Sequence, residues 1–141
     1  MNKQLLLKHI SSEQEMMPFY INEYVRSMQV SLKSYTTIYE YLKEFHRFFD
    51  WLYDSGIISD TNYKELSMSI LEHLKKQDIE SYILYLRERP KYNTSSQQAG
   101  LSQTTINRTI SALSSLFNSG RLRKVENKVF LEIFSPIPKL E

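Results

Sequence analysis

The sequence predicts an all-α fold, a compact bundle of four to five helices. Its 141 residues include only three glycines and four prolines, which favours long regular elements with few tight turns. Hydrophobic residues make up 41% and aromatic residues 13% of the chain, enough to build a core and to argue against disorder. Apolar residues recur at helical spacings of three and four in several segments, and no segment shows a convincing strand-like alternation.

Two elements are predicted before the longest helix. Residues 2–10 are expected to form a short helix or a frayed arm. A second helix is predicted from near Pro18 to Val30, because the missing N–H of proline is harmless in a first helical turn. Residues 29–33 are expected to be a connector.

The clearest helix is predicted from Ser34, a favourable N-cap, to about Asp54, with Gly56 as its stop. One face carries an apolar stripe, formed by Tyr35, Ile38, Leu42, Phe45, Phe49 and Leu52. The other face is expected to be polar and solvent-facing, and it carries Thr36, Thr37, Glu40, Lys43, Glu44, Arg47 and Asp50.

The middle of the chain is less regular. Residues 57–67 are expected to be a loop with a helical turn near 62–66, and residues 69–74 another turn. Asp78 is predicted to cap a compact helix that ends at Pro90. An exposed polar loop is then expected over residues 91–100.

A last long helix is predicted between Ser102, as N-cap, and a stop at Ser119 and Gly120. Its apolar face contains Ile106, Ile110, Leu113, Leu116 and Phe117. Its polar face lacks the usual Glu and Lys and instead carries Gln103, Thr104, Asn107, Arg108, Ser111, Ser114 and Ser115. Ser, Thr and Asn side chains compete with the helical backbone for hydrogen bonds. A helix that carries them despite this cost favours a polar surface that fits against another molecule. After it, residues 129–134 are expected to add one short helix.

The composition excludes several classes of chemistry. The sequence contains no cysteine, which excludes disulfides, thiolate zinc sites and cysteine nucleophiles. Its three histidines, His9, His46 and His73, have no metal-ligand spacing, and there is no glycine-rich phosphate loop. We therefore expect no active site, no metal and no cofactor. The apolar run near the N-terminus is too short for a signal peptide or a membrane span, so a cytoplasmic protein is expected.

The two polar helix faces are the main indication of a function in this sequence. Helix N-termini carry unpaired N–H groups and a partial positive charge, so the first turns after Ser34 and Ser102 are suited to phosphate. Arg, Asn, Gln, Ser and Thr supply both phosphate and base contacts in DNA complexes. Each face alone would more often be ordinary solvated surface, and the net charge of +2 permits nucleic-acid binding without requiring it.

Three segments carry a family resemblance. The pattern over residues 102–117 resembles the last major helix in the N-terminal, core-binding domain of tyrosine recombinases and phage integrases. Residues 34–51 resemble the earlier DNA-facing helix of that domain, and residues 78–90 the helix between them. The resemblance implies a SAM-like integrase N-terminal fold. On this basis we expect residues 1–15 to be an arm or short helix, 16–134 the core-binding domain, and 135–141 the start of a linker to a catalytic domain.

The resemblance implies sequence-specific binding of double-stranded DNA, in chromosome dimer resolution or DNA integration, without catalysis by these residues. In the family, four protomers meet at the synapse, so other recombinase protomers are expected as partners of the full-length protein. Residue matching places twelve residues at the DNA: Lys33, Ser34, Thr36, Thr37, Lys43, Arg47, Gln103, Thr104, Thr105, Asn107, Arg108 and Ser111. Asn107 and Arg108 are the candidates for base edges. Glu40 either accepts from a cytosine or pairs with Lys43. The alternative is a helical protein–protein interaction module.

Overall fold

The computed structural model describes residues 2–88 and 102–118, and within these ranges all regular secondary structure is helical. The elements are α1 (Lys3–Met16), α2 (Phe19–Val30), α3 (Tyr35–Asp54), a 3-10 turn η1 (Tyr63–Glu65), α4 (Met68–Glu72), α5 (Lys76–Glu88) and α6 (Gln103–Phe117). The prediction of an all-α fold is confirmed. The described ranges hold one α-helix more than the largest number expected, because the turn predicted at residues 69–74 is the short helix α4.

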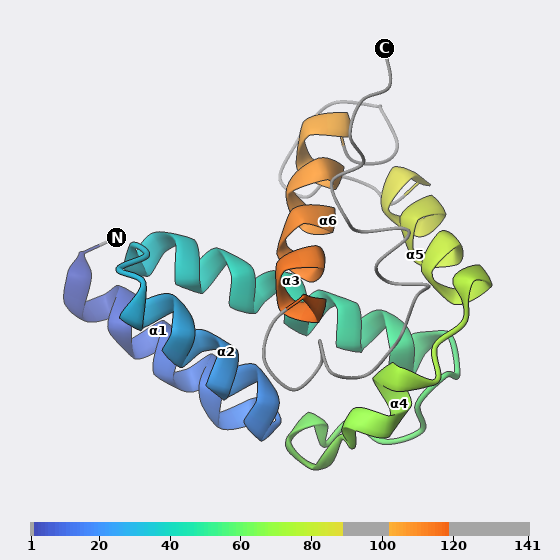
Figure 1. Cartoon of the computed structure of the whole chain (residues 1–141), viewed down its shortest axis with the longest axis horizontal. Helices are drawn as coiled ribbons and strands as arrows, with labels where there is room; N and C mark the ends of the chain where they lie inside the picture. The colour runs from blue at the N-terminus through green and yellow to red at the C-terminus, as the bar shows by residue number, and fades with distance from the viewer. Residues whose placement is uncertain (1, 89–101, 119–141) are drawn as a thin grey trace.

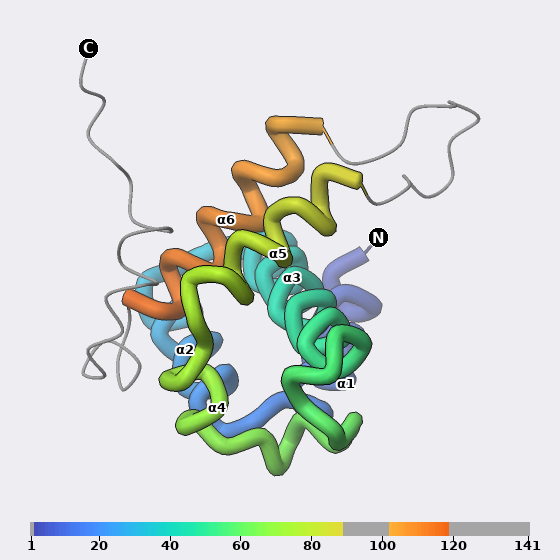
Figure 2. The backbone as a smooth tube through the Cα atoms, turned by 90° about the vertical axis from the view of Figure 1, so that its right-hand side faces the viewer, coloured from blue at the N-terminus to red at the C-terminus, as the bar shows by residue number. Residues whose placement is uncertain are grey.

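Helix α3 is the centre of the bundle, with α1 on one flank and α6 on the other (Figure 1). α5 and α6 lie side by side and run in opposite directions, and α1 lies along α3 (Figure 2). α2 reaches both α3 and α6, since the ring of Tyr24 packs edge-on against Phe45 and its hydroxyl hydrogen-bonds Ser115. α3 therefore connects the N-terminal helices to the C-terminal pair.

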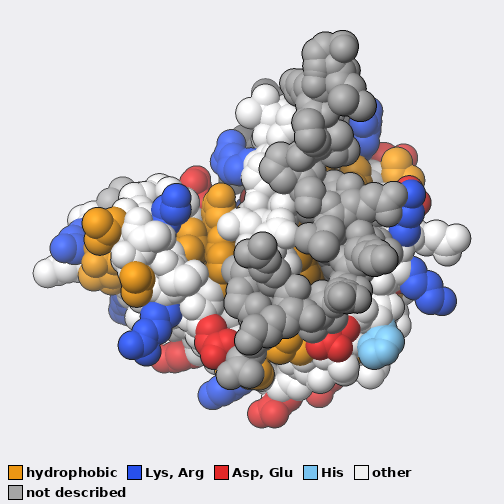
Figure 3. Space-filling model, in the orientation of Figure 1, with side chains coloured by type: hydrophobic (Ala, Val, Ile, Leu, Met, Phe, Trp, Pro, Cys, Tyr) orange, Lys and Arg blue, Asp and Glu red, His pale blue; other side chains and the backbone are white. Residues whose placement is uncertain are grey.

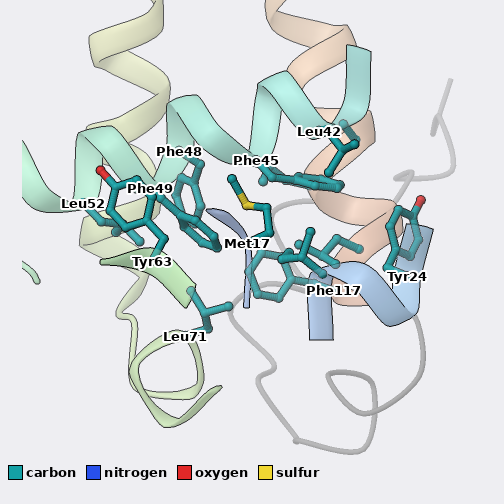
Figure 4. Packing of buried hydrophobic residues seen from close by; sticks show 14 of the residues in the cluster. Met17, Tyr24, Leu42, Phe45, Phe48, Phe49, Leu52, Tyr63, Leu71 and Phe117 are labelled. Atoms are coloured by element: carbon teal, nitrogen blue, oxygen red, sulfur yellow. The ribbon is translucent and has the colours of Figure 1, made fainter. Parts of the chain in front are cut away.

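The predicted apolar stripe of α3 forms part of the core except for Tyr35, which is 39% exposed. Ile38, Leu42, Phe45, Phe49 and Leu52 are all 0–1% exposed. Figure 4 shows Met17, from the segment that joins α1 to α2, among rings contributed by α3 and α6. Burying side chains of this size contributes about 1.5–3 kcal/mol each to folding, so this stripe makes a large contribution to stability.

Both predicted serine caps are confirmed. Ser34 Oγ accepts from the N–H of Thr37 at 3.1 Å, and Ser102 Oγ accepts from the N–H of Thr105 at 3.2 Å. These bonds satisfy N–H groups that no helical carbonyl can reach and so define where α3 and α6 begin.

Two helix boundaries differ from the sequence prediction, the end of α1 and the start of α5. α1 runs from Lys3 to Met16 as a full helix rather than ending near Ile10, because its buried Ile10 packs into the common core. α5 begins at Lys76, so Asp78 as the cap was wrong. Asp78 lies in the first turn, where its Oδ2 accepts from the N–H of Lys75 at 2.9 Å, which is the reciprocal half of a capping box.

Several predicted features lie outside the described residues: the helix end at Pro90, the loop over residues 91–100, the stop at Ser119 and Gly120, the short helix over 129–134 and the linker over 135–141.

The turns before and after α3 share one backbone motif. At the end of α2, the N–H of Leu32 bonds Gln29 O at 3.1 Å and the N–H of Lys33 bonds Met28 O at 3.0 Å. At the end of α3, the N–H of Gly56 bonds Tyr53 O at 3.0 Å and the N–H of Ile57 bonds Leu52 O at 2.9 Å. This pair of bonds is the Schellman motif, which needs a left-handed residue. That residue is Leu32 (φ 63°) in the first turn and Gly56 (φ 83°) in the second.

Candidate nucleic-acid interface

The predicted site residues of α3 follow its solvent side and its N-terminal end. Lys33, Ser34 and Thr36 are exposed, whereas Thr37, Lys43 and Arg47 are half-buried. Because a helix rises 1.5 Å per residue, these residues extend over roughly 20 Å along α3. The face is therefore long enough to follow a groove, but its members do not form one compact cluster.

The predicted residues of α6 lie on one exposed face. Gln103, Thr104, Asn107, Arg108 and Ser111 are exposed, and Thr105 is half-buried beside its cap. Gln103 Nε2 donates to Asn107 Oδ1 at 2.9 Å across one helical turn. Asn107 retains its amide N–H groups for another acceptor, so this face has the donors that the prediction required.

The two faces meet at an ion pair. Arg108 Nη1 of α6 lies 3.9 Å from Glu40 Oε2 of α3, and the two side chains are 52% and 43% exposed. The prediction left Glu40 with either a base or Lys43 as partner, whereas the ion pair found here is with Arg108. Since a long pair at this exposure contributes little energy, the contact shows that the faces adjoin rather than what holds them together.

The strong contact between the helices is a buried carboxylate that the sequence reasoning missed. Glu44 is 6% exposed, although it was predicted on the solvent side of α3, and that placement was wrong. Its Oε1 accepts from the hydroxyl of Thr109 on α6 at 3.1 Å, and its Oε2 accepts from Arg47 Nη1 at 3.1 Å. The prediction treated α3 as having one buried face, but α6 covers a second flank, and Glu44 lies under it.

This buried carboxylate also determines where Arg47 lies. The guanidinium of Arg47 is 40% exposed and its Nη1 is held by Glu44. A guanidinium has five N–H donors in a planar fork, so Arg47 can hold Glu44 and still present other donors to an anion. Arg47 is thus a positioned cation, unlike a freely rotating surface arginine.

Lys43 is positioned by aromatic rings. Its Nζ lies 4.6 Å from the ring centre of Tyr39, and that ring stacks on His9 of α1 at 5.6 Å. A cation over an aromatic face is held by about 0.5–1 kcal/mol when exposed. Lys43 therefore belongs to the flank of α3 that α1 covers, whereas Glu40 and Glu44 belong to the flank that α6 covers.

The α1 flank has its own polar contact. His46 Nδ1 lies 2.9 Å from Glu13 Oε1, and His46 Nε2 lies 3.6 Å from Asp50 Oδ1. The hydrogen bond to Glu13 is the largest influence on the pKa of His46 and raises it, partial burial opposes the rise, and the charges of Glu13 and Asp50 add to it. Asp50 also accepts from the hydroxyl of Tyr63 at 2.6 Å. These groups fasten α1 and η1 to α3.

Residues 2–88 and 102–118 contain neither a metal site nor a membrane-spanning helix. No group of three or more His, Cys, Asp or Glu side chains in these ranges is arranged to hold a metal ion. None of the helices in this described part has the length and apolar character needed to cross a membrane. The adjoining polar faces of α3 and α6 are thus the candidate site that the described residues offer.

The chain has sequence relatives among known proteins. Over 117 residues, 83% of this chain, the sequence is 53% identical to the tyrosine recombinase XerS of Streptococcus uberis. Over the same share it is 53% identical to XerS of a Streptococcus agalactiae serotype III strain and 52% identical to XerS of Streptococcus mutans. The sequence matches no family profile, and no solved structure matches it.

The match covers 33% of each of these recombinases, so the chain spans about a third of the length of the curated relatives it matches. The predicted resemblance to tyrosine recombinases is confirmed. Over 83% of its length this chain is a homologue of the XerS tyrosine recombinases, and it is consistent with an N-terminal part of such a protein.

Proposed function

We propose that this chain binds double-stranded DNA as the core-binding part of a XerS-like tyrosine recombinase. The observation that carries the proposal is the ion pair between Glu40 and Arg108, because it makes the polar faces of α3 and α6 one continuous surface. Two adjoining helix faces offer more contacts to a groove and its phosphate walls than one isolated face. The names of the relatives, tyrosine recombinases, support the same assignment.

The residues divide into two roles. The cations, the hydroxyls and the amide of Gln103 are assigned to phosphates, and these residues are Lys33, Ser34, Thr36, Thr37, Lys43, Arg47, Gln103, Thr104, Thr105 and Ser111. Asn107 and Arg108 are assigned to base edges, since amide and guanidinium groups read adenine and guanine through paired hydrogen bonds. The 3.9 Å pair with Glu40 is weak enough for Arg108 to exchange it for a base.

We further propose that the chain has no catalysis of its own. Strand cleavage, and with it chromosome dimer resolution or DNA integration, would belong to the parts of a XerS-like recombinase beyond the 33% that this chain matches. Other recombinase protomers would be partners of that full-length protein at its synapse.

A salt titration of duplex binding tests the proposal. Neutralising each phosphate releases counterions, so the log of the binding constant should fall with the log of salt concentration by about 0.9 per contact. Several phosphate contacts along α3 and α6 therefore predict a steep slope for duplex DNA. A folded chain that binds no duplex at low salt would contradict the proposal.

Paired arginine variants separate base reading from general charge. Arg108→Ala should weaken binding to a preferred duplex by about 1–3 kcal/mol if Arg108 reads a base. Arg87→Ala is the matched control, because Arg87 is also an exposed helical arginine but lies on α5. Equal losses for the two variants would remove Arg108 from the interface.

The second candidate function is a helical protein-interaction module, and one observation favours it. Leu84 and Tyr85 of α5 are 58% and 40% exposed and lie next to each other. Truncation of both side chains to alanine should leave duplex binding unchanged if the proposed DNA function is correct.

A further inference from the structure

Leu32 has a backbone conformation and an exposure that stability alone does not explain. It is the left-handed residue of the turn between α2 and α3, with a φ of 63°, and its side chain is 89% exposed. The left-handed conformation disfavours residues with a Cβ, and glycine is the usual occupant of this position. A leucine here thus gives up backbone stability and gains no burial in return. Strain kept without a packing reason is a sign of function.

Exposed apolar residues flank Leu32 in the sequence, and the charged residues nearest to it along the chain are basic. Val30 is 76% exposed and Tyr35 is 39% exposed. Residues 2–12 and 24–39 contain Lys3, Lys8, Arg26 and Lys33 and no aspartate or glutamate, and Glu23 and Glu40 border the second range. Lys3 Nζ lies 5.6 Å from the ring centre of Tyr35, so the start of α1 belongs to the same surface. Figure 3 shows hydrophobic and basic side chains together at this end of the molecule, on the left.

This charge pattern selects the partner. A surface whose nearest charged residues are cations fits a polyanion, and the partner must also offer an apolar group to Leu32. Duplex DNA offers both, because its phosphates are anionic and the 5-methyl groups of thymine project into the major groove. Leu32 directly precedes Lys33 and Ser34, the first residues of the proposed DNA-binding face. An apolar side chain at that point would enter the groove ahead of α3.

We propose that Leu32 contacts thymine methyl groups in the major groove and gives the chain a preference for thymine at the end of its site. The inference rests on the proposed DNA binding and adds a contact of different chemistry to it. Asn107 and Arg108 of α6 are assigned to base donors and acceptors, whereas Leu32 reads an apolar group that only thymine presents.

Removal of the methyl group from the DNA is the direct test. The probes are an alternating dA–dT duplex and the same duplex with deoxyuridine in place of thymidine, which lacks only the 5-methyl groups. The wild-type chain should bind the deoxyuridine duplex about fourfold more weakly or worse, the effect of losing about 0.8 kcal/mol for one buried methyl group. Leu32→Ala and Leu32→Gly should bind both duplexes equally well.

Two controls make the result specific. Leu84→Ala removes another exposed leucine, 58% exposed on α5, and should keep the thymine preference of the wild type. Leu32→Gly should also unfold at a higher urea concentration than the wild type, so weaker binding by this variant cannot come from unfolding.

Three outcomes would overturn the inference, and they are distinguishable. If the wild-type chain binds neither duplex at low salt, the proposed function and the Leu32 contact both fail. If it binds both duplexes but shows no thymine preference, or the Leu32 variants keep that preference, only the Leu32 contact fails. If Leu32→Gly instead abolishes a concentration-dependent self-association measured by sedimentation, the surface serves a second copy of the chain.

Discussion

The turns at the two ends of α3 have the same backbone hydrogen bonds but different residues at the left-handed position. In the turn that leaves the helix, Gly56 takes the left-handed position, and a Cβ built there would meet nothing within 4 Å. The chain then passes to Ile57, which is half-buried, and to Ile58, which is 5% exposed. In the turn that enters the helix, Leu32 takes the left-handed position and the exposed Lys33 follows it.

The turn at Gly56 has the residues that stabilise this motif, whereas the turn at Leu32 does not. Gly56 avoids backbone strain, and the residues after it add to the core, as is usual in this motif. Leu32 accepts strain, and neither it nor Lys33 is buried. Since the hydrogen bonds are the same, the difference lies in the residues alone, and single substitutions can measure it.

The largest effect is expected for Gly56→Leu, which gives the second turn the residue of the first. Because the added Cβ meets no neighbour, the cost is the left-handed backbone itself, about 1–2 kcal/mol of unfolding free energy. Urea denaturation measures it. Gly56→Asn is the matched control and should cost less, since asparagine tolerates this conformation. An unchanged midpoint for Gly56→Leu would remove the basis of the comparison.

The reverse change, Leu32→Gly, should stabilise the chain by about 1 kcal/mol, because relief of backbone strain exceeds the added freedom of the unfolded chain. Leu32→Ala should have almost no effect on stability, since it keeps the strained backbone and removes a side chain that is 89% exposed. Thermal and urea unfolding of both variants check this. A destabilised Leu32→Gly would mean that the leucine contributes packing after all.

A smaller effect concerns His46, which joins α1 to the C-terminal half of α3. Its pKa is raised above the ordinary value of 6.5, chiefly by the hydrogen bond to Glu13. Its stabilising contribution is therefore fully present below about pH 6.5 and is lost as the pH rises through the higher folded-state pKa. We expect less than about 1 kcal/mol for this partly exposed pair. The urea midpoint of His46→Gln should approach that of the wild type as the pH rises, and a constant gap would contradict the assignment.

The smallest expected quantity is the coupling between the two turns. They are separated by the length of α3, which is roughly 30 Å at 1.5 Å per residue. Effects at sites this far apart usually add within about 0.5 kcal/mol. The double variant Leu32→Gly/Gly56→Leu should therefore unfold with the sum of the two single effects. A larger deviation would show that α3 transmits strain from end to end.

Local signals in the sequence predicted much of this fold. Ser34 and Ser102 were identified as caps because a serine directly before a segment of helical periodicity is a typical N-cap. Both accept a hydrogen bond from the N–H three residues later. The stop at Gly56 was predictable for the same reason, since only a left-handed residue ends a helix in this way. These features depend on neighbours in the chain, which the sequence shows directly.

Features that depend on distant contacts were not predictable. Glu44 belongs to the polar face of α3 in the sequence pattern. It is buried because α6 packs over it, with Thr109, which is far away in the sequence, in contact with it. Leu32 escaped notice because a connector leucine gives no sign of a positive φ. Of the candidate DNA contacts, the sequence indicated which residues share a helix face, but only the three-dimensional arrangement showed that Arg108 meets Glu40.

The carboxylate of Glu44 has a consequence for how rigid the paired helices are. If α6 slid or rotated along α3 by one residue, Thr109 would leave Oε1, and a charge that is 6% exposed would lose a donor. Arg47 would still pair with Oε2, but a buried carboxylate that loses one of its two donors is destabilised, so intermediate positions are unfavourable. The register between α3 and α6 is thus fixed from inside the protein, and any molecule that contacts both must conform to that spacing.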